Sequence, residues 1–418
     1  MSNTPAIRFK GYTDPWEQCK LGKIAKFRQG IQIDLEKQYT EDADTRERFI
    51  RIVDYTQGTD DVRYIDKVDN ANYVDVDDVV IVRYGATAGF VGCGIKGLIA
   101  NNMFTVNPTE VLDKKFLYTY MKQDSMYDYL NSSNGSSAMP AINFGIVSAL
   151  DILYPNINEQ RKIGEYFNRL DNLITLHQRK CDEMTELKKF MLQKIFPKNG
   201  ERFPEIRFKG YTDPWEQRKF PEVFDFLQNN TLSRAELNYD RGVAKNVHYG
   251  DVLVKFGEYL DVSKTTLPYI TVQYVVDKYK GSLLQDGDVV MADTAEDETA
   301  GKCTEIAELQ GFPTISGLHT IPMRPKESFA TGYLGYYMNS RAYHDQLLPM
   351  MQGIKVVSVS KSAIQNTDVL FPSDISEQAA IGQYFIQLDT LITLHQRKCG
   401  ELNDIKKFML QNMFPKKG

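Results

Sequence analysis

Apolar residues recur at alternating steps of four and three residues over two 40-residue stretches, 159–198 and 377–416. This spacing is typical of the seam of a coiled coil. A proline stands shortly before each stretch and another near its end, where each would bound a helix. The sequence therefore predicts two helices of about 38 residues, each about 57 Å long. The seam positions are Ile163, Phe167, Leu170, Ile174, His177, Ile381, Phe385, Leu388, Ile392 and His395.

The two stretches are copies of one another, because 27 of their 40 positions are identical. A second repeat, IRFKGYTDPWEQ, occurs without change at residues 7–18 and 206–217. The inserts between the repeats, 19–158 and 218–376, share scattered apolar positions and little else. The chain therefore has a duplicated frame that carries two divergent inserts.

Each insert has the pattern of a mixed α/β domain. The first has strand-like runs at 49–54 and 79–84, then a glycine-rich stretch and a helix-like run at 116–123. The second has strand-like runs at 252–256, 269–276 and 288–292, then a helix-like run at 333–340. Both end in a strand-like approach to proline, at 151–155 and 368–372. We expect an α/β (α+β) protein with two pseudo-symmetric domains of one fold, separated by two long antiparallel coiled-coil helices.

The repeats predict four segments along the chain. Residues 1–157 form the N-terminal segment and first insert, and 158–199 the first spacer helix. Residues 200–375 contain the linking repeat and second insert, and 376–418 the second spacer helix. An antiparallel helix pair is favoured over a parallel one, and it would bring together His177 and His395, the middle of each seam. These histidines would either fix the register of the pair or have ordinary hydrogen bonds. Metal binding with the neighbouring cysteines is the less favoured alternative.

Composition indicates an ordinary globular protein, with 42% hydrophobic and 25% charged residues. No apolar run approaches the ~18 residues of a membrane span, and the N-terminus has no secretory pattern. We therefore expect a cytoplasmic protein. The five cysteines form no CxxC pair, which argues against a zinc site. The net charge of −5 requires that any DNA contact come from local clusters or from partner subunits.

The sequence contains no catalytic motif that we recognise. The phosphate-binding GxxxxGK[ST] loop, the HExxH zinc motif and the GxSxG nucleophile motif are all absent. The two Asp-Pro-Trp sequences at 14–16 and 213–215 follow no glycine-rich cofactor loop, so we interpret them as structural turns. We expect a chain that is not an enzyme and that binds no cofactor or metal itself.

Polar side chains in the glycine-rich loops of the first insert are candidates for DNA contacts. Arg83, next to Tyr84, ends an apolar strand and could pair with guanine. Asn101, Asn102 and Asn143 could contact adenine, whereas Ser136 and Ser137 suit phosphate. For each residue the alternative is an ordinary solvated side chain.

The tandem sequences EQRKIGEYFNRLDNLITLHQRK (159–180) and EQAAIGQYFIQLDTLITLHQRK (377–398) carry a resemblance over essentially the whole chain. The chain resembles the specificity subunits of type I restriction–modification systems. The resemblance implies that each insert reads one half of a bipartite double-stranded DNA target. It also implies that the paired helices set the spacing and dock two methylation subunits. S-adenosylmethionine would then belong to the methylation subunits, and ATP and Mg to restriction subunits.

The second insert departs from the first at the position of Arg83, where alignment of the two strands places Asp293. A carboxylate can accept from cytosine N4, but the acidic loop 292–301 would repel phosphates. We therefore expect other DNA anchors in this insert, namely His248, Tyr249, Lys255, Lys355 and Lys361.

The sequence is also compatible with three other functions, and the repeat has one further consequence. The inserts could bind proteins or glycans on a coiled-coil scaffold, or the chain could serve a methyltransferase complex that lacks a restriction subunit. A self-sufficient methyltransferase is disfavoured by the missing cofactor loop. As a corollary, residues 1–200 form a complete half that should dimerise through the first helix.

Overall fold

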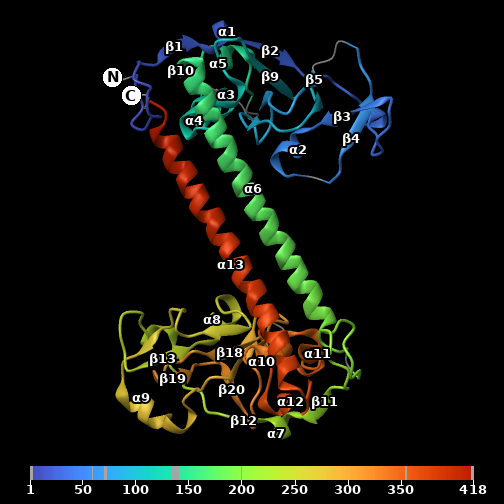
Figure 1. Ribbon diagram of the computed structural model, residues 1–418, viewed down its shortest axis with the longest axis vertical. Coiled ribbons are helices and arrows are strands. Elements are labelled where there is room, and N and C mark those ends of the chain that lie inside the picture. The colour runs from blue at the N-terminus through green and yellow to red at the C-terminus, as the bar shows by residue number, and fades with distance from the viewer. Residues whose placement is uncertain are drawn as a thin grey trace. The chain divides into compact units, whose positions relative to one another are not determined.

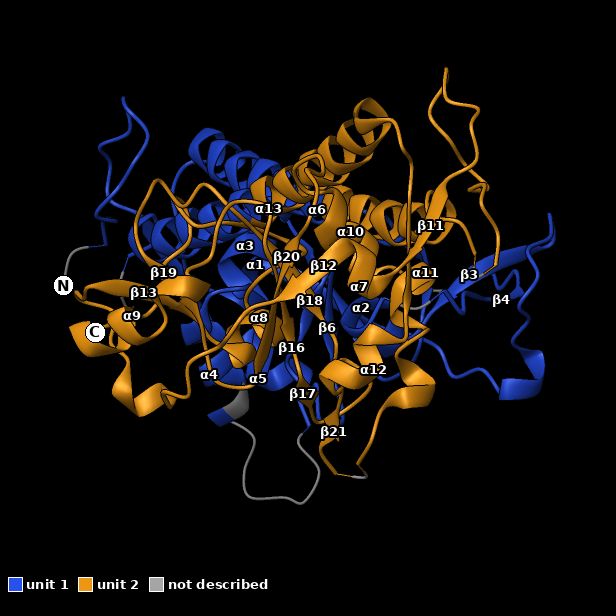
Figure 2. Cartoon of the chain, turned by 90° about the horizontal axis from the view of Figure 1, so that it is seen from below, with its two compact units in different colours: residues 1–178, 397–418 blue, residues 179–396 orange. Residues whose placement is uncertain are grey.

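The computed structural model describes residues 3–58, 60–69, 73–132, 141–198, 200–353 and 355–415 (Figure 1). The chain forms two compact units (Figure 2). Unit 1 contains residues 1–178 and 397–418, and unit 2 contains residues 179–396. The predicted 38-residue helices are confirmed as α6 (Ile157–Lys194) and α13 (Ile375–Asn412). The units do not follow the four predicted segments, because each helix contributes one end to each unit.

Unit 1 contains two four-stranded sheets and a separate strand pair. The first sheet has the order β2-β9-β6-β7 and the second the order β4-β3-β8-β5, while β1 pairs with β10. The strands are β1 (Glu17–Lys20), β2 (Ala25–Gln29), β3 (Arg46–Ile50), β4 (Arg63–Asp66), β5 (Tyr73–Val74), β6 (Val79–Val82), β7 (Val91–Gly92), β8 (Gly97–Ile99), β9 (Met103–Pro108) and β10 (Asp151–Tyr154). The helices are α1 (Leu21–Ile24), α2 (Ile52–Thr56), α3 (Lys114–Met121), α4 (Asp124–Ser132) and α5 (Phe144–Ser148).

Unit 2 contains sheets of the order β12-β20-β16-β18-β14 and β15-β13-β19, and the pairs β11-β22 and β17-β21. The strands are β11 (Glu216–Lys219), β12 (Phe224–Phe226), β13 (Ala244–Val247), β14 (Tyr259–Asp261), β15 (Tyr269–Ile270), β16 (Val289–Ala292), β17 (Thr294–Ala295), β18 (Cys303–Ala307), β19 (Thr314–Ser316), β20 (Thr320–Pro325), β21 (Val357–Ser358) and β22 (Asp368–Phe371). The helices are α7 (Phe220–Val223), α8 (Tyr249–Val254), α9 (Gln273–Lys278), α10 (Tyr333–Asn339), α11 (Arg341–His344) and α12 (Lys361–Gln365).

The two units share one topology, as the sequence predicted. Strands β2, β9, β6 and β7 correspond in order and direction to β12, β20, β16 and β18. The second sheets also correspond, since β3 runs parallel to β8 and β13 runs parallel to β19. The mixed α/β fold class is therefore confirmed.

Three predicted strands were partly or wholly wrong. Residues 252–254 belong to helix α8, residues 273–276 to helix α9, and residues 52–54 to helix α2. Each is a short apolar run, and such runs do not distinguish a strand from a buried helix face. The predicted strands at 79–84, 151–155, 288–292 and 368–372 are confirmed within one or two residues as β6, β10, β16 and β22. The predicted helices at 116–123 and 333–340 are confirmed within two residues as α3 and α10.

The long helices run antiparallel within each unit. In unit 1, Lys406 of α13 pairs with Asp171 of α6, and the Cys399 Sγ lies 3.6 Å from the Ile174 carbonyl oxygen. In unit 2, Lys188 of α6 pairs with Asp389 of α13 at 2.7 Å, and the rings of Phe196 and Phe385 stack. In both units the residue numbers rise along one helix as they fall along the other.

The first three seam positions of each helix enter the core of a unit. Ile163, Phe167 and Leu170 belong to the core of unit 1, and Ile381, Phe385 and Leu388 to that of unit 2. Ile174 and Ile392 are half-buried. His177 and His395 fall in different units, so their meeting stays a prediction.

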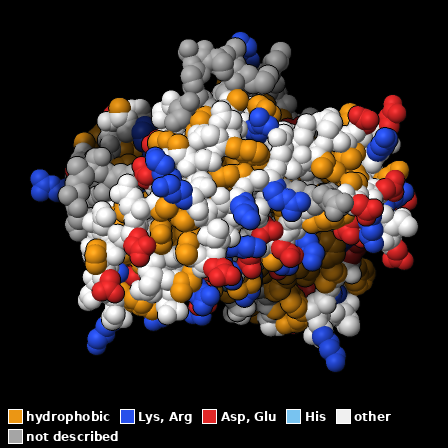
Figure 3. Space-filling view, turned by 90° about the horizontal axis from the view of Figure 1, so that it is seen from above, with side chains coloured by type: hydrophobic (Ala, Val, Ile, Leu, Met, Phe, Trp, Pro, Cys, Tyr) orange, Lys and Arg blue, Asp and Glu red, His pale blue; other side chains and the backbone are white. Residues whose placement is uncertain are grey.

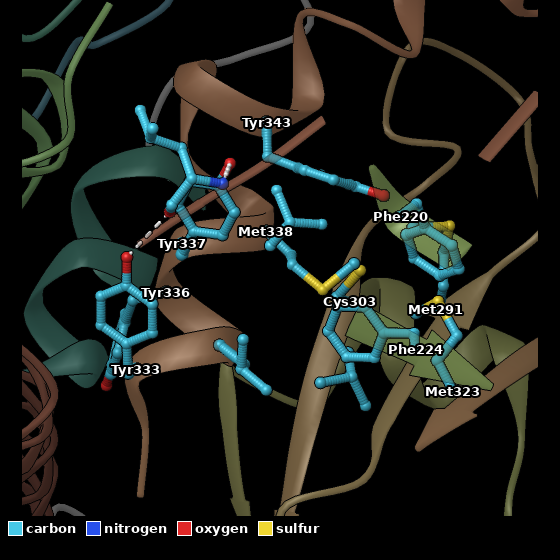
Figure 4. Close-up of a cluster of buried hydrophobic side chains, with 14 of the residues drawn as sticks. Phe220, Phe224, Met291, Cys303, Met323, Tyr333, Tyr336, Tyr337, Met338 and Tyr343 are labelled. Atoms are coloured by element: carbon cyan, nitrogen blue, oxygen red, sulfur yellow. Dashed lines mark hydrogen bonds between the residues drawn. The ribbon is translucent and has the colours of Figure 1, made fainter. Parts of the chain in front are cut away.

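An aromatic cluster closes each core. In unit 1, the Phe414 ring lies 5.6–6.1 Å from the rings of Trp16, Phe116, Tyr120 and Phe167. In unit 2, the Phe196 ring lies 5.7–6.3 Å from those of Trp215, Tyr333, Tyr337 and Phe385. Figure 4 shows part of this second core, with the tyrosines of α10 on one side and Phe220, Phe224, Met291 and Met323 on the other. The end of one long helix therefore completes the core of each unit.

The perfect repeat anchors the start of a long helix. Arg8 donates two hydrogen bonds, of 2.7 and 2.8 Å, to the buried carboxylate of Glu159, and Arg207 does the same to Glu377. The glutamine that follows each glutamate binds the loop before α3 or α10, because Gln160 accepts from the Asp113 N–H and Gln378 from the Ala330 N–H. The repeated arginine and the Glu-Gln pair are thus parts of one structural contact.

Candidate nucleic-acid interface

The candidate site in unit 1 begins where the buried central strand β6 ends. Arg83 follows this strand, and its backbone N–H donates to the Asn102 carbonyl at 2.8 Å. Its carbonyl accepts from the Ile142 N–H, also at 2.8 Å. The guanidinium carbon lies 4.7 Å from the centre of the Tyr84 ring, which is 37% exposed. The strand end therefore presents a cation and an aromatic ring together at the surface.

The loop before β9 supplies two asparagines to the same place. The Asn101 carbonyl accepts from the Gln29 side chain at 2.9 Å, which fixes this loop to strand β2. Asn102 accepts a hydrogen bond from the Arg83 backbone N–H through its own carbonyl. Its side-chain Oδ1 is buried and has no hydrogen-bond partner. The structure thus brings Arg83, Tyr84 and the 101–102 loop together.

The third segment of this site is the start of α5. Asn143 is exposed, and its Oδ1 accepts from the Ile146 N–H at 3.0 Å. Asn143 therefore caps α5, a role that the sequence analysis did not predict and that engages the acceptor expected to contact adenine. Ser136 and Ser137 lie outside the described residues.

Unit 2 repeats this backbone arrangement with different side chains. Asp293 follows β16; its N–H donates to the His319 carbonyl at 3.1 Å, and its carbonyl accepts from the Val359 N–H at 2.8 Å. Ser360 caps α12 as Asn143 caps α5. In unit 1, Tyr84 and Ala141 form an isolated antiparallel β-bridge. In unit 2 the strands β17 and β21 pair at the equivalent place, which Figure 2 shows at the edge of the unit. The alignment of Arg83 with Asp293 is therefore correct in three dimensions.

The Asp293 carboxylate lies in a cluster of basic and aromatic side chains. The His319 Nδ1 is 3.4 Å from its Oδ1, and the His319 ring lies edge-on to the Tyr249 ring at 5.3 Å. Burial raises the pKa of Asp293, while His319 and Lys361 act in the opposite direction. Lys361 lies over the Phe226 ring, with its ammonium 5.3 Å from the ring centre. Two predicted anchors, Tyr249 and Lys361, thus belong to this cluster.

The other predicted residues of unit 2 have different surroundings. His248 is buried, and its Nδ1 accepts from the Gly250 N–H and caps α8. Burial lowers the pKa of His248, which favours the neutral ring. Lys255 pairs with Asp251 at 3.6 Å and lies over the Tyr239 ring. Lys355 is exposed. His248 is therefore a structural cap, while the lysines remain available at the surface.

Sequence reasoning missed His319, the equivalent of Asn102, although it could have been found by extending the alignment. Each is the last residue before a long strand, β9 or β20, and each lies 217 residues from its counterpart. The offset changes from 210 to 217, because the segment between β16 and β19 is seven residues longer than the segment between β6 and β8. Only the hydrogen bonds to Arg83 and Asp293 make the correspondence evident.

The metal-binding capacity and the surface charge of the described residues also bear on function. No group of three or more His, Cys, Asp or Glu side chains among the described residues could hold a metal ion. On the face drawn in Figure 3, basic side chains are mixed with acidic ones and form no continuous basic patch. Among the described helices, none is long and apolar enough to cross a membrane.

Comparisons with known proteins give a consistent result. Residues 13–186 match the family model of the type I restriction modification DNA specificity domain. A type I restriction enzyme specificity subunit of Methanocaldococcus jannaschii, MjaVIII, is 22% identical over 345 residues, which cover 80% of this chain and 77% of the relative. The crystal structure of the S subunit of a type I restriction–modification system from M. genitalium has a TM-score of 0.59 at 13% identity. That likeness covers 99% of this chain and 100% of the other, and it shows a common fold.

Proposed function

As this chain is a specificity subunit of a type I restriction–modification system, we propose that each of its units reads one half of a two-part DNA target. The observation that carries the proposal is the contrast between frame and site. The two units share strand order, helix anchors and aromatic closure. At the equivalent strand ends they present Arg83 in one unit and Asp293 in the other. A shared fold with different side chains at the equivalent strand ends is what recognition of two different half-sites requires.

The long helices are proposed to hold the two half-sites at a fixed separation. Each helix has 38 residues and is therefore about 57 Å long. Half-sites on one face of B-DNA lie about 34 Å apart, or a multiple of this distance. A helix pair of this length is sufficient to span one turn of DNA with an unspecified spacer between the half-sites.

A duplicated set of exposed apolar side chains on α6 and α13 supports the docking of two copies of one partner. Each unit has four such side chains at equivalent positions, two from each helix, and all are between 37% and 56% exposed. Ile375, at the start of α13, is exposed as well and is not part of the duplicated set. Large exposed apolar side chains at regular positions typically mark an interaction surface. The set is Leu173, Leu176, Ile405 and Phe408 in unit 1 and Leu391, Leu394, Leu187 and Phe190 in unit 2. We propose that two methylation subunits bind there.

Catalysis is proposed to belong to the partners. The candidate site consists of hydrogen-bonding side chains at strand ends, without a nucleophile activated by a base. We propose that this chain is not itself an enzyme. S-adenosylmethionine would bind the methylation subunits, and ATP and Mg would bind the restriction subunits. Those partners would also supply basic surface, which a subunit of net charge −5 needs near DNA.

The test is to express the chain with its methylation subunits and to map every methylated adenine in the host genome. The expected target has two short specified segments separated by a spacer of constant length. A single continuous target, or a pattern that does not depend on this chain, would contradict the proposal. If the units instead bound proteins or glycans, the complex would show no salt-dependent binding to duplex DNA.

A further inference from the structure

The ends of the central strands, β6 and β16, are the place where the two units differ most sharply on the same backbone. Arg83 and Asp293 make equivalent backbone hydrogen bonds. The N–H of each donates to the residue before a long strand, Asn102 or His319, and the carbonyl of each accepts from the residue before a helix cap. These bonds fix the direction in which each side chain leaves the strand. Any ligand that reaches Arg83 in unit 1 would therefore meet Asp293 at the corresponding place in unit 2.

Unpaired polar atoms gather at this place in both units. Ten buried side-chain nitrogen and oxygen atoms of the described residues lack a hydrogen-bond partner. Three of them lie here, namely the Arg83 Nε, the Asn102 Oδ1 and the Asp293 Oδ1. The Asp293 Oδ1 lies 3.4 Å from the His319 Nδ1. Because buried polar groups are nearly always paired, these atoms point to a polar ligand.

The backbone of unit 2 is strained beside this aspartate. His319 has a positive φ of 54°, a conformation that few residues other than glycine adopt. Such strain is found more often at functional sites than elsewhere. The His319 side chain is 51% exposed and that of Asp293 is 29% exposed. Both side chains therefore remain accessible to a molecule outside the unit.

The two side chains have opposite hydrogen-bonding capacity. A guanidinium only donates, and an ionised carboxylate only accepts. In the major groove guanine presents two acceptors, N7 and O6, whereas cytosine presents the N4 amino donor. Arginine therefore matches guanine, and aspartate matches cytosine.

We propose that Arg83 and Asp293 are equivalent specificity-determining residues, and that Arg83 selects guanine in one half-site while Asp293 selects cytosine in the other. The inference rests on the proposed function, in which each unit reads one half-site. It departs from the expectation that the second insert contacts DNA through residues other than Asp293. The Asp293 carboxylate stands apart from the exposed Asp297, whose side chain is bound to Thr299 within a turn.

The test uses the full chain with its methylation subunits and a library of randomised duplexes, from which bound sequences are selected and read. Arg83→Gln should shift one position of one half-site from guanine to adenine, the base that glutamine matches. Asp293→Asn should shift one position of the other half-site from cytosine to adenine. A good side-chain–base pair discriminates by about 1–3 kcal/mol, so each preference should change about 5- to 150-fold. All other positions should stay unchanged.

Matched controls remove the same charge in the same unit. Arg63→Gln removes a cation from β4, and Asp297→Asn removes a carboxylate four residues from Asp293. Neither should alter a base preference. Thermal melting establishes that each variant folds. If Arg83→Gln does not fold, Arg83→Lys keeps the charge without the two-pronged donor and should weaken the same preference. If Asp293→Asn does not fold, Asp293→Ser should weaken the preference for cytosine.

Two results would overturn the inference, and they are distinguishable. If the wild-type complex selects two half-sites but the folded variants leave every position unchanged, or alter positions in both halves, Arg83 and Asp293 do not determine specificity. The proposed function would then still stand. If the wild-type complex selects no defined sequence at all, the proposed function fails together with the inference.

Discussion

In unit 1 the start of α6 is anchored by Arg8 and Glu159, and in unit 2 the start of α13 is anchored by Arg207 and Glu377, with the same two distances. The ends of β6 and β16 are not retained in this way, because equivalent backbone positions carry side chains of opposite charge, Arg83 and Asp293. Residues that hold the helices are thus retained in both copies, whereas the residues at the ends of β6 and β16 differ. The comparison separates the part of the chain that maintains the fold from the part that reads a ligand.

The frame itself differs at the start of one core helix. In unit 1, α3 is capped by the residue before it, because Asp113 accepts from the Phe116 N–H at 2.9 Å. In unit 2, the residue before α10 is Gly332, which has φ +85° and no side chain to cap the helix. The buried Glu305 of β18 accepts instead from the N–H groups of Gly332 and Gly335. The same helix is therefore capped locally in one unit and from a neighbouring strand in the other.

The largest expected effect is the loss of folding of unit 1 when the end of α13 is removed. A fragment of residues 1–200 lacks 397–418, which complete unit 1. It retains the equivalent segment 179–198, whose Phe196 matches Phe414. We expect the fragment to be folded only as a dimer, in which each copy supplies this segment to the other. Sedimentation measures the mass, and a monomeric, well-folded fragment would show that the two helix ends are not interchangeable.

Removal of the closing aromatic ring should also have a large effect. Phe414→Ala should destabilise unit 1 by about 3–5 kcal/mol, as is usual for a buried phenylalanine. Phe408→Ala, on the same helix but 56% exposed, should change stability by no more than about 0.5 kcal/mol. Hydrogen exchange of unit 1 peptides measures both effects. Equal effects of the two substitutions would mean that Phe414 does not close the core.

The buried ion pairs allow a direct comparison of the units. Glu159→Ala leaves Arg8 without its partner and should destabilise unit 1 by about 3–5 kcal/mol. Glu377→Ala should cost about 1 kcal/mol more, because the Trp215 N–H also donates to Glu377 at 3.3 Å, whereas the Trp16 N–H has no partner.

Thermal melting and hydrogen exchange of each unit measure the difference between these two substitutions. The control is Asp151→Ala, which breaks an exposed pair with Lys20 and should cost less than about 1 kcal/mol. An effect of Glu159→Ala as small as that of the control would exclude a stabilising role for the repeat contact.

The cap on α10 should give unit 2 a pH dependence. Burial raises the pKa of Glu305 to about 7 from its ordinary value of 4.5. Between these values the folded protein keeps a proton that the unfolded chain has released, so stability should fall as pH rises from about 4.5 to about 7. The total change is about 3 kcal/mol. Glu305→Gln should remove this slope, as measured by hydrogen exchange of α10 across a pH series.

The matched control is Asp113→Asn, which keeps a good capping residue on α3 in unit 1 and should leave the slope of unit 2 unchanged. A slope that persists in Glu305→Gln would assign the titration to another group.

The repeats in the sequence were sufficient to predict the long helices, the two equivalent domains and the position shared by Arg83 and Asp293. These predictions succeed because periodicity and self-alignment are local properties of the sequence. Helices α8 and α9 were missed because their apolar runs are too short to distinguish a strand from a helix. The capping roles of His248 and Asn143 were not predicted, because a polar residue before a helix can serve as a cap or as a surface contact. Their DNA contacts stay predictions.

The closure of unit 1 by Phe414 could not be predicted from the sequence. Phe414 and Trp16 are at opposite ends of the chain, and neither periodicity nor repeat spacing indicates which core a helix end enters. The unpaired polar atoms at the strand ends could not be predicted either, because the absence of a hydrogen-bond partner is a property of the folded structure alone.

The most direct test of the central claim is to exchange one reading region at a time and to map the methylated sites of the assembled complex. Residues 21–150 lie between the paired strands β1 and β10, and residues 220–367 between β11 and β22, so both can be replaced with the frame kept intact. Each region would be replaced by the corresponding region of another specificity subunit. We predict that each exchange changes one half of the target and leaves the other half and the spacer length unchanged. A change in both halves, or in neither, would contradict the assignment of one half-site to each unit.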